Sequence, residues 1–190
     1  MEFLLRVPGA FLAPVIHEFI KARASSALGD PTPKKNGFNY NPFKYFEPIG
    51  FFLMLFFGVG WGQPAITSPF YYKNKKNGVL FVHVTPMFAN LLIGMAAIFL
   101  MNFVTLPDTA ALIIFHFGRL NIRLALFNLI PIAPMAMNKI LQVFISPSAA
   151  MSLNNYEKPL QIVLFLLLMF NIVELVIHPI SLIFMRAVMF

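Results

Sequence analysis

The chain has 190 residues, of which 59% are hydrophobic and 11% are charged, whereas a soluble domain contains about 45–50% apolar and about 25% charged residues. This composition, with 23 Phe and 11 Met, predicts an integral membrane protein. It excludes a disordered tail, a coiled coil and a nucleic-acid-binding module, despite a net charge of +7. The absence of Cys excludes a disulfide framework, a thiolate nucleophile and a cysteine metal site.

The first two apolar runs differ in what they predict. Residues 3–19 contain Pro8 and Pro14 but no small-residue cleavage site, so we expect this stretch in the mature fold. The run from Pro48 to Trp61 has about 14 residues, too few to cross a hydrocarbon core of about 30 Å upright. It predicts a tilted helix, a helix in a thinned bilayer or a re-entrant segment.

The third apolar run, Val79 to Val104, is long enough to span a membrane but contains polar side chains. His83, Thr85 and Asn90, together with Pro86, would be costly against lipid. We therefore expect this helix to be buried by protein on at least one side.

The last two apolar segments complete the predicted bundle. Leu106 to Leu141 is interrupted by polar residues and Pro, which predicts one helix, a polar turn and a second helix that ends near Pro131. Leu160 to Met185 predicts one spanning helix. The expected fold is an all-α polytopic bundle of about four to six hydrophobic segments, some broken or re-entrant. Its expected parts are a transmembrane core over 1–145, a polar linker over 146–159 and a C-terminal helix over 160–190.

Most Lys and Arg residues fall in two polar loops, Lys21 to Glu47 and Gln63 to Gly78. Loops of this kind are typical of the face of a bilayer that carries anionic headgroups. Within the second loop, the cluster from Tyr71 to Lys76 predicts an interfacial aromatic and basic belt. Because basic loops flank the run 48–61 on both sides, either that run is re-entrant or the charge rule fails there.

One motif carries chemistry: His17-Glu18 at the end of the first apolar stretch. In an H-E-x-x-H helix two His residues share one face and bind zinc, and the Glu acts as general base. A bare His-Glu pair is weak, and the segments that follow it strengthen the signal. They are Ala27-Leu28-Gly29-Asp30, Glu47-Pro48-Ile49-Gly50, Gly60-Trp61-Gly62-Gln63-Pro64, Ala89-Asn90-Leu91-Leu92 and Leu126-Phe127-Asn128-Leu129-Ile130-Pro131-Ile132-Ala133-Pro134.

In this order and spacing, over roughly residues 10–145, the chain resembles the site-2 protease family of intramembrane zinc metalloproteases. The resemblance implies a zinc site with two His ligands from the helix motif and an Asp ligand after the proline pair. By position the chain keeps His17 and the base Glu18. Lys21 stands where the second His is expected, and Ala136 stands where the Asp is expected. The Gly of the family's Ala-Gly-Pro motif is also missing.

The two lost ligands predict that the zinc site is gone, because a catalytic zinc ordinarily has three protein ligands and one imidazole cannot replace them. A lysine ammonium at a ligand position would also repel the cation. We therefore expect no cofactor and a pseudoprotease, not an enzyme, with His17 and Glu18 as vestigial groups and Lys21 balancing Glu18. The predicted role is a structural, assembly or regulatory subunit of a membrane complex. The alternatives are an active zinc protease with an atypical site and a component of a proton or ion pathway.

Ionisable residues inside apolar runs are functional candidates by default. Glu174 and His178 lie one helical turn apart beside Asn171, so they could contact a partner helix, pair internally or lie on a proton path. His83, His116 and His178 could form a metal site with His17, although they belong to separate segments and their spacing gives no support. The expected partners are other integral membrane protein subunits and a bilayer with anionic headgroups; no nucleic acid is expected. Which membrane holds the chain is not predicted.

Overall fold

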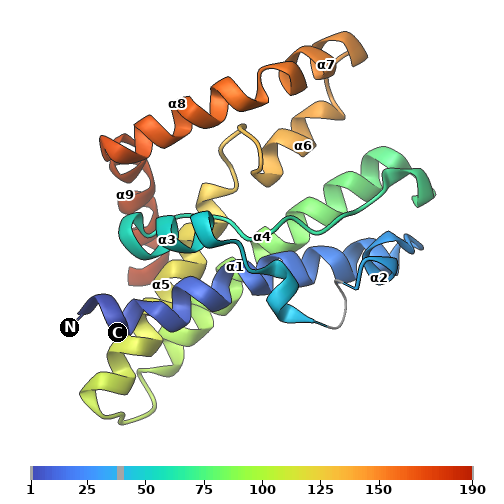
Figure 1. Cartoon of the computed structure of the whole chain (residues 1–190). Coiled ribbons are helices and arrows are strands. Elements are labelled where there is room, and N and C mark those ends of the chain that lie inside the picture. Colours follow the sequence, from blue (N-terminus) through green and yellow to red (C-terminus); the bar gives the residue numbers. More distant parts are fainter. Residues whose placement is uncertain (1, 38–40, 190) are drawn as a thin grey trace.

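The computed structural model describes residues 2–37 and 41–189, and within these residues the secondary structure is entirely helical. This confirms the predicted polytopic all-α fold. Three helices are long and apolar enough to cross a membrane: α1 (Glu2–Ala27), α4 (Lys75–Leu100) and α5 (Asp108–Phe127). They pack against one another at the centre of the molecule (Figure 1). The coarse prediction of a multi-pass membrane protein therefore stands.

The central helices pack closely where small residues face each other. On α4 Gly94 meets Gly118 of α5, and a Cβ at Gly118 would lie 2.7 Å from Ile98 Cγ1 and 2.8 Å from the Gly94 carbonyl oxygen. Small residues allow this approach in helices that pack within membranes. The short distance between the backbones positions the polar side chains of α1, α4 and α5 for the contacts described below.

The short apolar run forms a ten-residue helix, and the chain then returns to its starting place. Helix α3 (Pro48–Phe57) starts from η1 (Pro42–Tyr45), ends at Gly58 with φ 70°, and the chain then returns in extended form over residues 59–68. The Gln63 N–H donates to the Tyr45 carbonyl at 2.8 Å, so the segment leaves and returns at the same place. Gly50 and Gly60 lie at this contact, where a Cβ would overlap neighbouring backbone. This path fits the re-entrant alternative, which stays a prediction.

The predicted interruption within Leu106–Leu141 is wrong, because α5 runs unbroken through Arg119, Asn121 and Arg123. Asn121 and Arg123 do not end the helix because their side chains find hydrogen-bond partners inside the protein, Asn90 for Asn121 and Glu174 for Arg123. The chain breaks after α5, over residues 128–135, and α6 (Ala136–Gln142) and α7 (Pro147–Asn155) follow.

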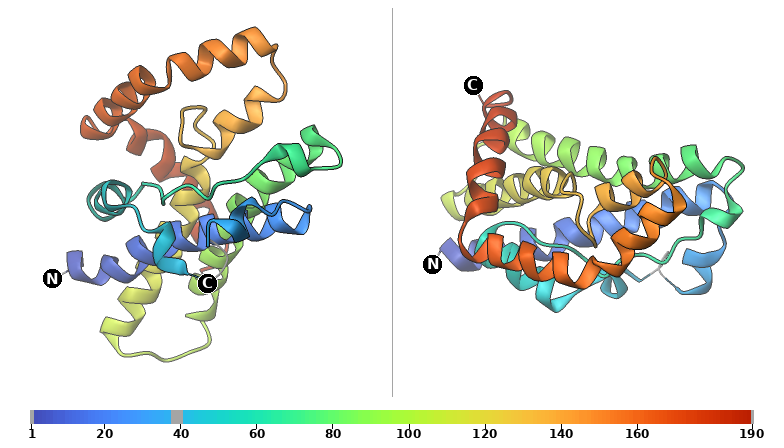
Figure 2. Two further views of the ribbon diagram at one scale, coloured as in Figure 1. Left: turned by 45° about the vertical axis from the view of Figure 1, so that its right-hand side comes forward. Right: turned by 90° about the horizontal axis from the view of Figure 1, so that it is seen from above.

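The predicted single helix over Leu160–Met185 is also wrong. The segment forms α8 (Glu157–Met169) and α9 (Ile172–Arg186), which are bent by 70° (Figure 2). Asn171 lies at the bend with φ 55°, a left-handed conformation that Asn tolerates better than most residues. Helix α9 packs on α5, so the bend brings Glu174 next to the core.

Candidate functional site

Helix α1 presents the His17-Glu18 motif to the interior. The Lys21 ammonium lies 3.0 Å from Glu18 Oε2, and both side chains are 9% exposed. The same carboxylate oxygen accepts a hydrogen bond from the Ala65 N–H at 2.8 Å, which fixes the extended segment against α1. Glu18 is thus held by a cation and a backbone donor, an arrangement that stabilises a buried carboxylate.

His17 belongs to a hydrogen-bond network that joins the three central helices. His17 Nδ1 lies 2.9 Å from Asn90 Oδ1 of α4, and the Asn90 amide donates to the Ala13 carbonyl and to Asn121 Oδ1 of α5. Because Asn90 Nδ2 faces two acceptors, its oxygen must accept, and His17 Nδ1 carries the proton. The network explains why polar residues lie inside three apolar helices.

The side chains at the motif do not fit a zinc ion. Within residues 2–37 and 41–189, no three His, Asp or Glu side chains lie close enough to share a metal, whereas a catalytic zinc ordinarily has three protein ligands. The Lys21 ammonium also occupies the position beside Glu18. His83 is the one other histidine near His17, and its Nδ1 is buried with no hydrogen-bond partner among the described residues. His116 and His178 lie elsewhere, so no four-histidine cluster forms.

Ala136, at the position where the resemblance implies an Asp, lies in an apolar cluster with Met87 and Ile140. Its N–H donates to Asn128 Oδ1 at 3.1 Å, so the Asn that follows α5 caps the turn into α6. The adjacent Ala133 and Pro134 face Lys21 across a cavity of about 670 Å³. The motif helix and the proline-rich segment therefore form two walls of one cavity.

The wall of this cavity nearest α1 is the extended segment, with Pro64, Ala65, Ile66 and Thr67 lining it, while His83, Lys139 and Glu157 complete the polar lining. Burial, and then the nearby Glu18 carboxylate, raises the pKa of Tyr45 to about 12, so this phenol stays neutral at the base of the segment.

Glu174 pairs with Arg123, one of the polar residues within the predicted interruption of the run Leu106–Leu141. Arg123 is 1% exposed and donates to both Glu174 carboxylate oxygens. His178 Nδ1 lies 3.6 Å from Glu174 Oε1, and its side chain is 46% exposed. Asn171, the third candidate, lies at the bend. A charged residue in an apolar run needs a partner. The presence of Glu174 in such a run therefore predicts a pairing with a buried basic residue such as Arg123.

Asp30, outside the apolar helices, joins the two basic loops. It accepts hydrogen bonds from Ser25 Oγ at 2.7 Å, the Thr32 N–H at 2.9 Å and the Ser68 N–H at 2.7 Å. Burial alone would raise the pKa of Asp30, but these hydrogen bonds outweigh it and hold the pKa below its ordinary value. Tyr72 joins the same group through its hydroxyl, 2.7 Å from Ser25 Oγ. Tyr72 is buried, so it does not belong to an exposed aromatic belt.

Comparison with known proteins gives one relative. The chain is 27% identical over 152 residues to a Bacillus subtilis protein named "Putative zinc metalloprotease YwhC", which covers 75% of this chain and 69% of the relative. No family model matches the chain, and no solved structure gives a significant match. The prediction that the chain is not an enzyme is wrong by this comparison, because the relative is named for protease activity. The likeness points in the same direction as the motifs, toward zinc metalloproteases.

Proposed function

We propose that this chain binds an extended segment of another integral membrane protein in the cavity beside Glu18. The observation that carries the proposal is the edge formed by Pro64 and Ile66. Alternate residues of an extended chain direct their backbone groups to opposite edges. The N–H groups of Gln63 and Ala65 face Tyr45 and Glu18.

The backbone groups of Pro64 and Ile66 therefore lie on the other edge of the segment, and both residues line the cavity. Within the described part of the chain, the Ile66 N–H has no hydrogen-bond partner. An open edge of this kind pairs with an extended peptide, and the cavity volume lies in the range of about 300–1,000 Å³ that is usual for ligand sites. Lys21, Lys139 and Glu157 add charges that would select among segments.

Photo-crosslinking tests the binding. A benzophenone amino acid replaces Ile66 in the cavity or, as a matched control, Phe88 on the exposed face of α4. We expect discrete protein adducts from position 66 and none of these adducts from position 88. Ile66→Pro removes the free N–H and should abolish the adducts of a second crosslinker placed at Thr67, whereas Ile66→Val should retain them. Identical adducts from positions 66 and 88 would refute the proposal.

Hydrolysis of the bound segment is a second candidate, favoured by the relative's name and by the retained His17 and Glu18. No step through a metal follows from the described side chains, so the candidate is tested by its products. Cleaved fragments of the crosslinked protein that accumulate with the parent chain and disappear with Glu18→Gln would assign hydrolysis to this site. A matched loss of one carboxylate outside the cavity, Asp108→Asn at the exposed start of α5, should leave such fragments unchanged.

We further propose that the chain holds no zinc at His17, because Lys21 and Ala136 stand at two ligand positions. Elemental analysis after dialysis against a weak chelator should find far less than one zinc per chain. About one zinc per chain, lost in His17→Ala, would contradict this proposal and would leave the peptide-binding proposal intact.

A further inference from the structure

A second cavity, of about 190 Å³, lies at the opposite half of α1 from the peptide cavity. Its lining comes from α1, from the end of α3, from α5 and from the start of α9. The charged or ionisable side chains that line it are Arg6, His116, Arg119 and Glu174. The cavity has room for several water molecules, since one water occupies about 30 Å³.

Glu174, the acid that lines this cavity, already forms an ion pair with Arg123. Arg123 donates to both oxygens of Glu174, and it also donates to the carbonyls of Gly58 at 2.9 Å and Phe57 at 3.0 Å. These contacts fix the end of α3, the middle of α5 and the start of α9 to one another. Glu174 thus supplies one negative charge to a region that holds three arginines, Arg6, Arg119 and Arg123.

In the part of the chain that the structure describes, Arg6 and Arg119 therefore share the cavity with a single carboxylate, Glu174, which already pairs with Arg123. Among the described residues neither side chain has an ion pair or hydrogen bond, and Arg6 Nε is buried. Arg123, Arg6 and Glu174 are all near enough to act electrostatically on Arg119, and the two like charges outweigh the one opposite charge. Positive charges that converge on a partly buried cavity repel one another, and a bound anion relieves that repulsion.

We propose that this cavity binds a phosphate group, either the headgroup of an anionic phospholipid or free inorganic phosphate. Guanidinium groups bind phosphate oxygens bidentately, and two of them can share one tetrahedral anion. The apolar rim offers a surface for the acyl chain of a lipid: Phe56 lines the cavity, is 62% exposed and lies against Phe3 with ring centroids 5.1 Å apart and tilted planes. An acyl chain could lie on these rings while its headgroup enters the cavity.

The test uses the full chain in nanodiscs of phosphatidylcholine. In this lipid the choline cation competes with the arginines for the phosphate of the headgroup. One arm titrates inorganic phosphate against matched chloride, and the other replaces part of the lipid by phosphatidylglycerol. A saturable rise in melting temperature with phosphate identifies the free ion, and a rise with phosphatidylglycerol alone identifies the headgroup. Either result supports the site, provided that Arg119→Gln weakens the response by about tenfold or more.

Arg186→Gln is the matched control, because Arg186 is an exposed arginine on α9 outside the cavity. It should respond like the parent. Without either probe, Arg119→Gln should melt no lower than the parent, because it removes repulsion. If Arg119→Gln does not fold, Arg119→Lys and Arg6→Gln replace it, and both should weaken the response. No rise with either probe, or equal responses of the Arg119 and Arg186 variants, would overturn the proposal.

Discussion

Lys21 and Glu18 form a buried ion pair within one helix. Lys21 lies one turn after Glu18 on α1, and its ammonium reaches the carboxylate at 3.0 Å inside the protein. A lone buried carboxylate is costly, so the cation makes the retained Glu18 tolerable. At the residue scale, therefore, the lysine has a structural role that is separate from the question of hydrolysis.

Replacing Lys21 with Met should cost about 3–5 kcal/mol, because breaking a buried ion pair leaves an uncompensated charge. The double variant Glu18→Gln with Lys21→Met should be milder, because it leaves no charge behind. Thermal melts of the variants in one detergent measure both effects, with the exposed Lys35→Met as control. A Lys21→Met protein that melts like the parent would show that Glu18 does not depend on this lysine.

Asp30 should make stability depend on pH. Its folded-state pKa is lowered, so its contribution is complete above the unfolded pKa of about 3.9 and is lost as the pH falls through the folded pKa. At neutral pH, Asp30→Asn should cost about 1.5–3 kcal/mol, because hydrogen bonds to a charged group are lost. The gap between parent and variant should close in acid. Melts across pH test this, with the exposed Asp108→Asn as control; a gap independent of pH would contradict it.

Among the elements, the crossing of α4 and α5 controls the site, because Asn90 and Asn121 meet across it. Gly118→Ala should therefore destabilise the protein by about 1–3 kcal/mol through overpacking against Ile98 and Gly94. Thermal melts give the measurement. Ala96→Val adds bulk to an exposed position of α4 and should have little effect. Equal melting of Gly118→Ala and the parent would mean that the two helices are farther apart.

In the bent pair α8 and α9, tertiary contacts outweigh the tendency of the apolar sequence to form one straight helix. Its sequence is apolar enough for one straight span, but Asn171 adopts a left-handed conformation and α9 turns onto α5. The bend between α8 and α9 is stabilised by the ion pair of Glu174 with Arg123. It is also stabilised by the packing of Val173 and Ile177 in the main apolar cluster. The break between the two helices is favoured because it brings Glu174 to the buried Arg123 and gives that arginine a hydrogen-bonded counter-charge.

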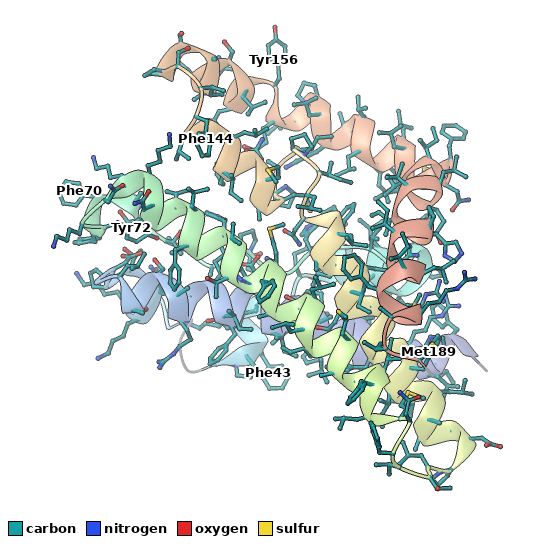
Figure 3. The ribbon with its side chains drawn as sticks, turned by 180° about the vertical axis from the view of Figure 1, so that it is seen from behind. Phe43, Phe70, Tyr72, Phe144, Tyr156 and Met189 are labelled. Atoms are coloured by element: carbon teal, nitrogen blue, oxygen red, sulfur yellow. The ribbon has the colours of Figure 1, made fainter. Side chains whose placement is uncertain are left out.

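On the scale of the whole molecule, the two basic loops lie at one end. Ser25, in the last turn of α1, and Asp30, which follows α1, contact Tyr72 and Ser68, which precede α4. In Figure 3, Phe70, Tyr72 and Phe144 gather at this end and Met189 lies away from it. Lys76 lies over the Phe144 ring at 4.1 Å. The turn between α4 and α5, at the other end of α4, contains no Lys or Arg over residues 101–107.

This asymmetry predicts that the basic end faces the cytoplasm. Because the chain has no Cys, single cysteines at Lys35, Lys73 and Thr105 can be labelled in intact cells with a membrane-impermeant maleimide. Thr105→Cys should react from outside, whereas Lys35→Cys and Lys73→Cys should react only after the cells are opened. Labelling of Lys35→Cys and Lys73→Cys from opposite sides would show that the run 48–61 crosses the membrane.

The sequence by itself determined the membrane class, the helical fold and the place of the His17-Glu18 motif in the first apolar stretch. These features follow from composition, from the length of apolar runs and from residue identity, all of which are local. Tertiary structure decided that the chain returns to Tyr45 after α3, that α5 continues through its arginines and that α8 bends into α9. In each case a polar or backbone group inside the membrane needs a partner from a distant segment. Arg123 and Glu174, 51 positions apart, find each other only when the chain is folded.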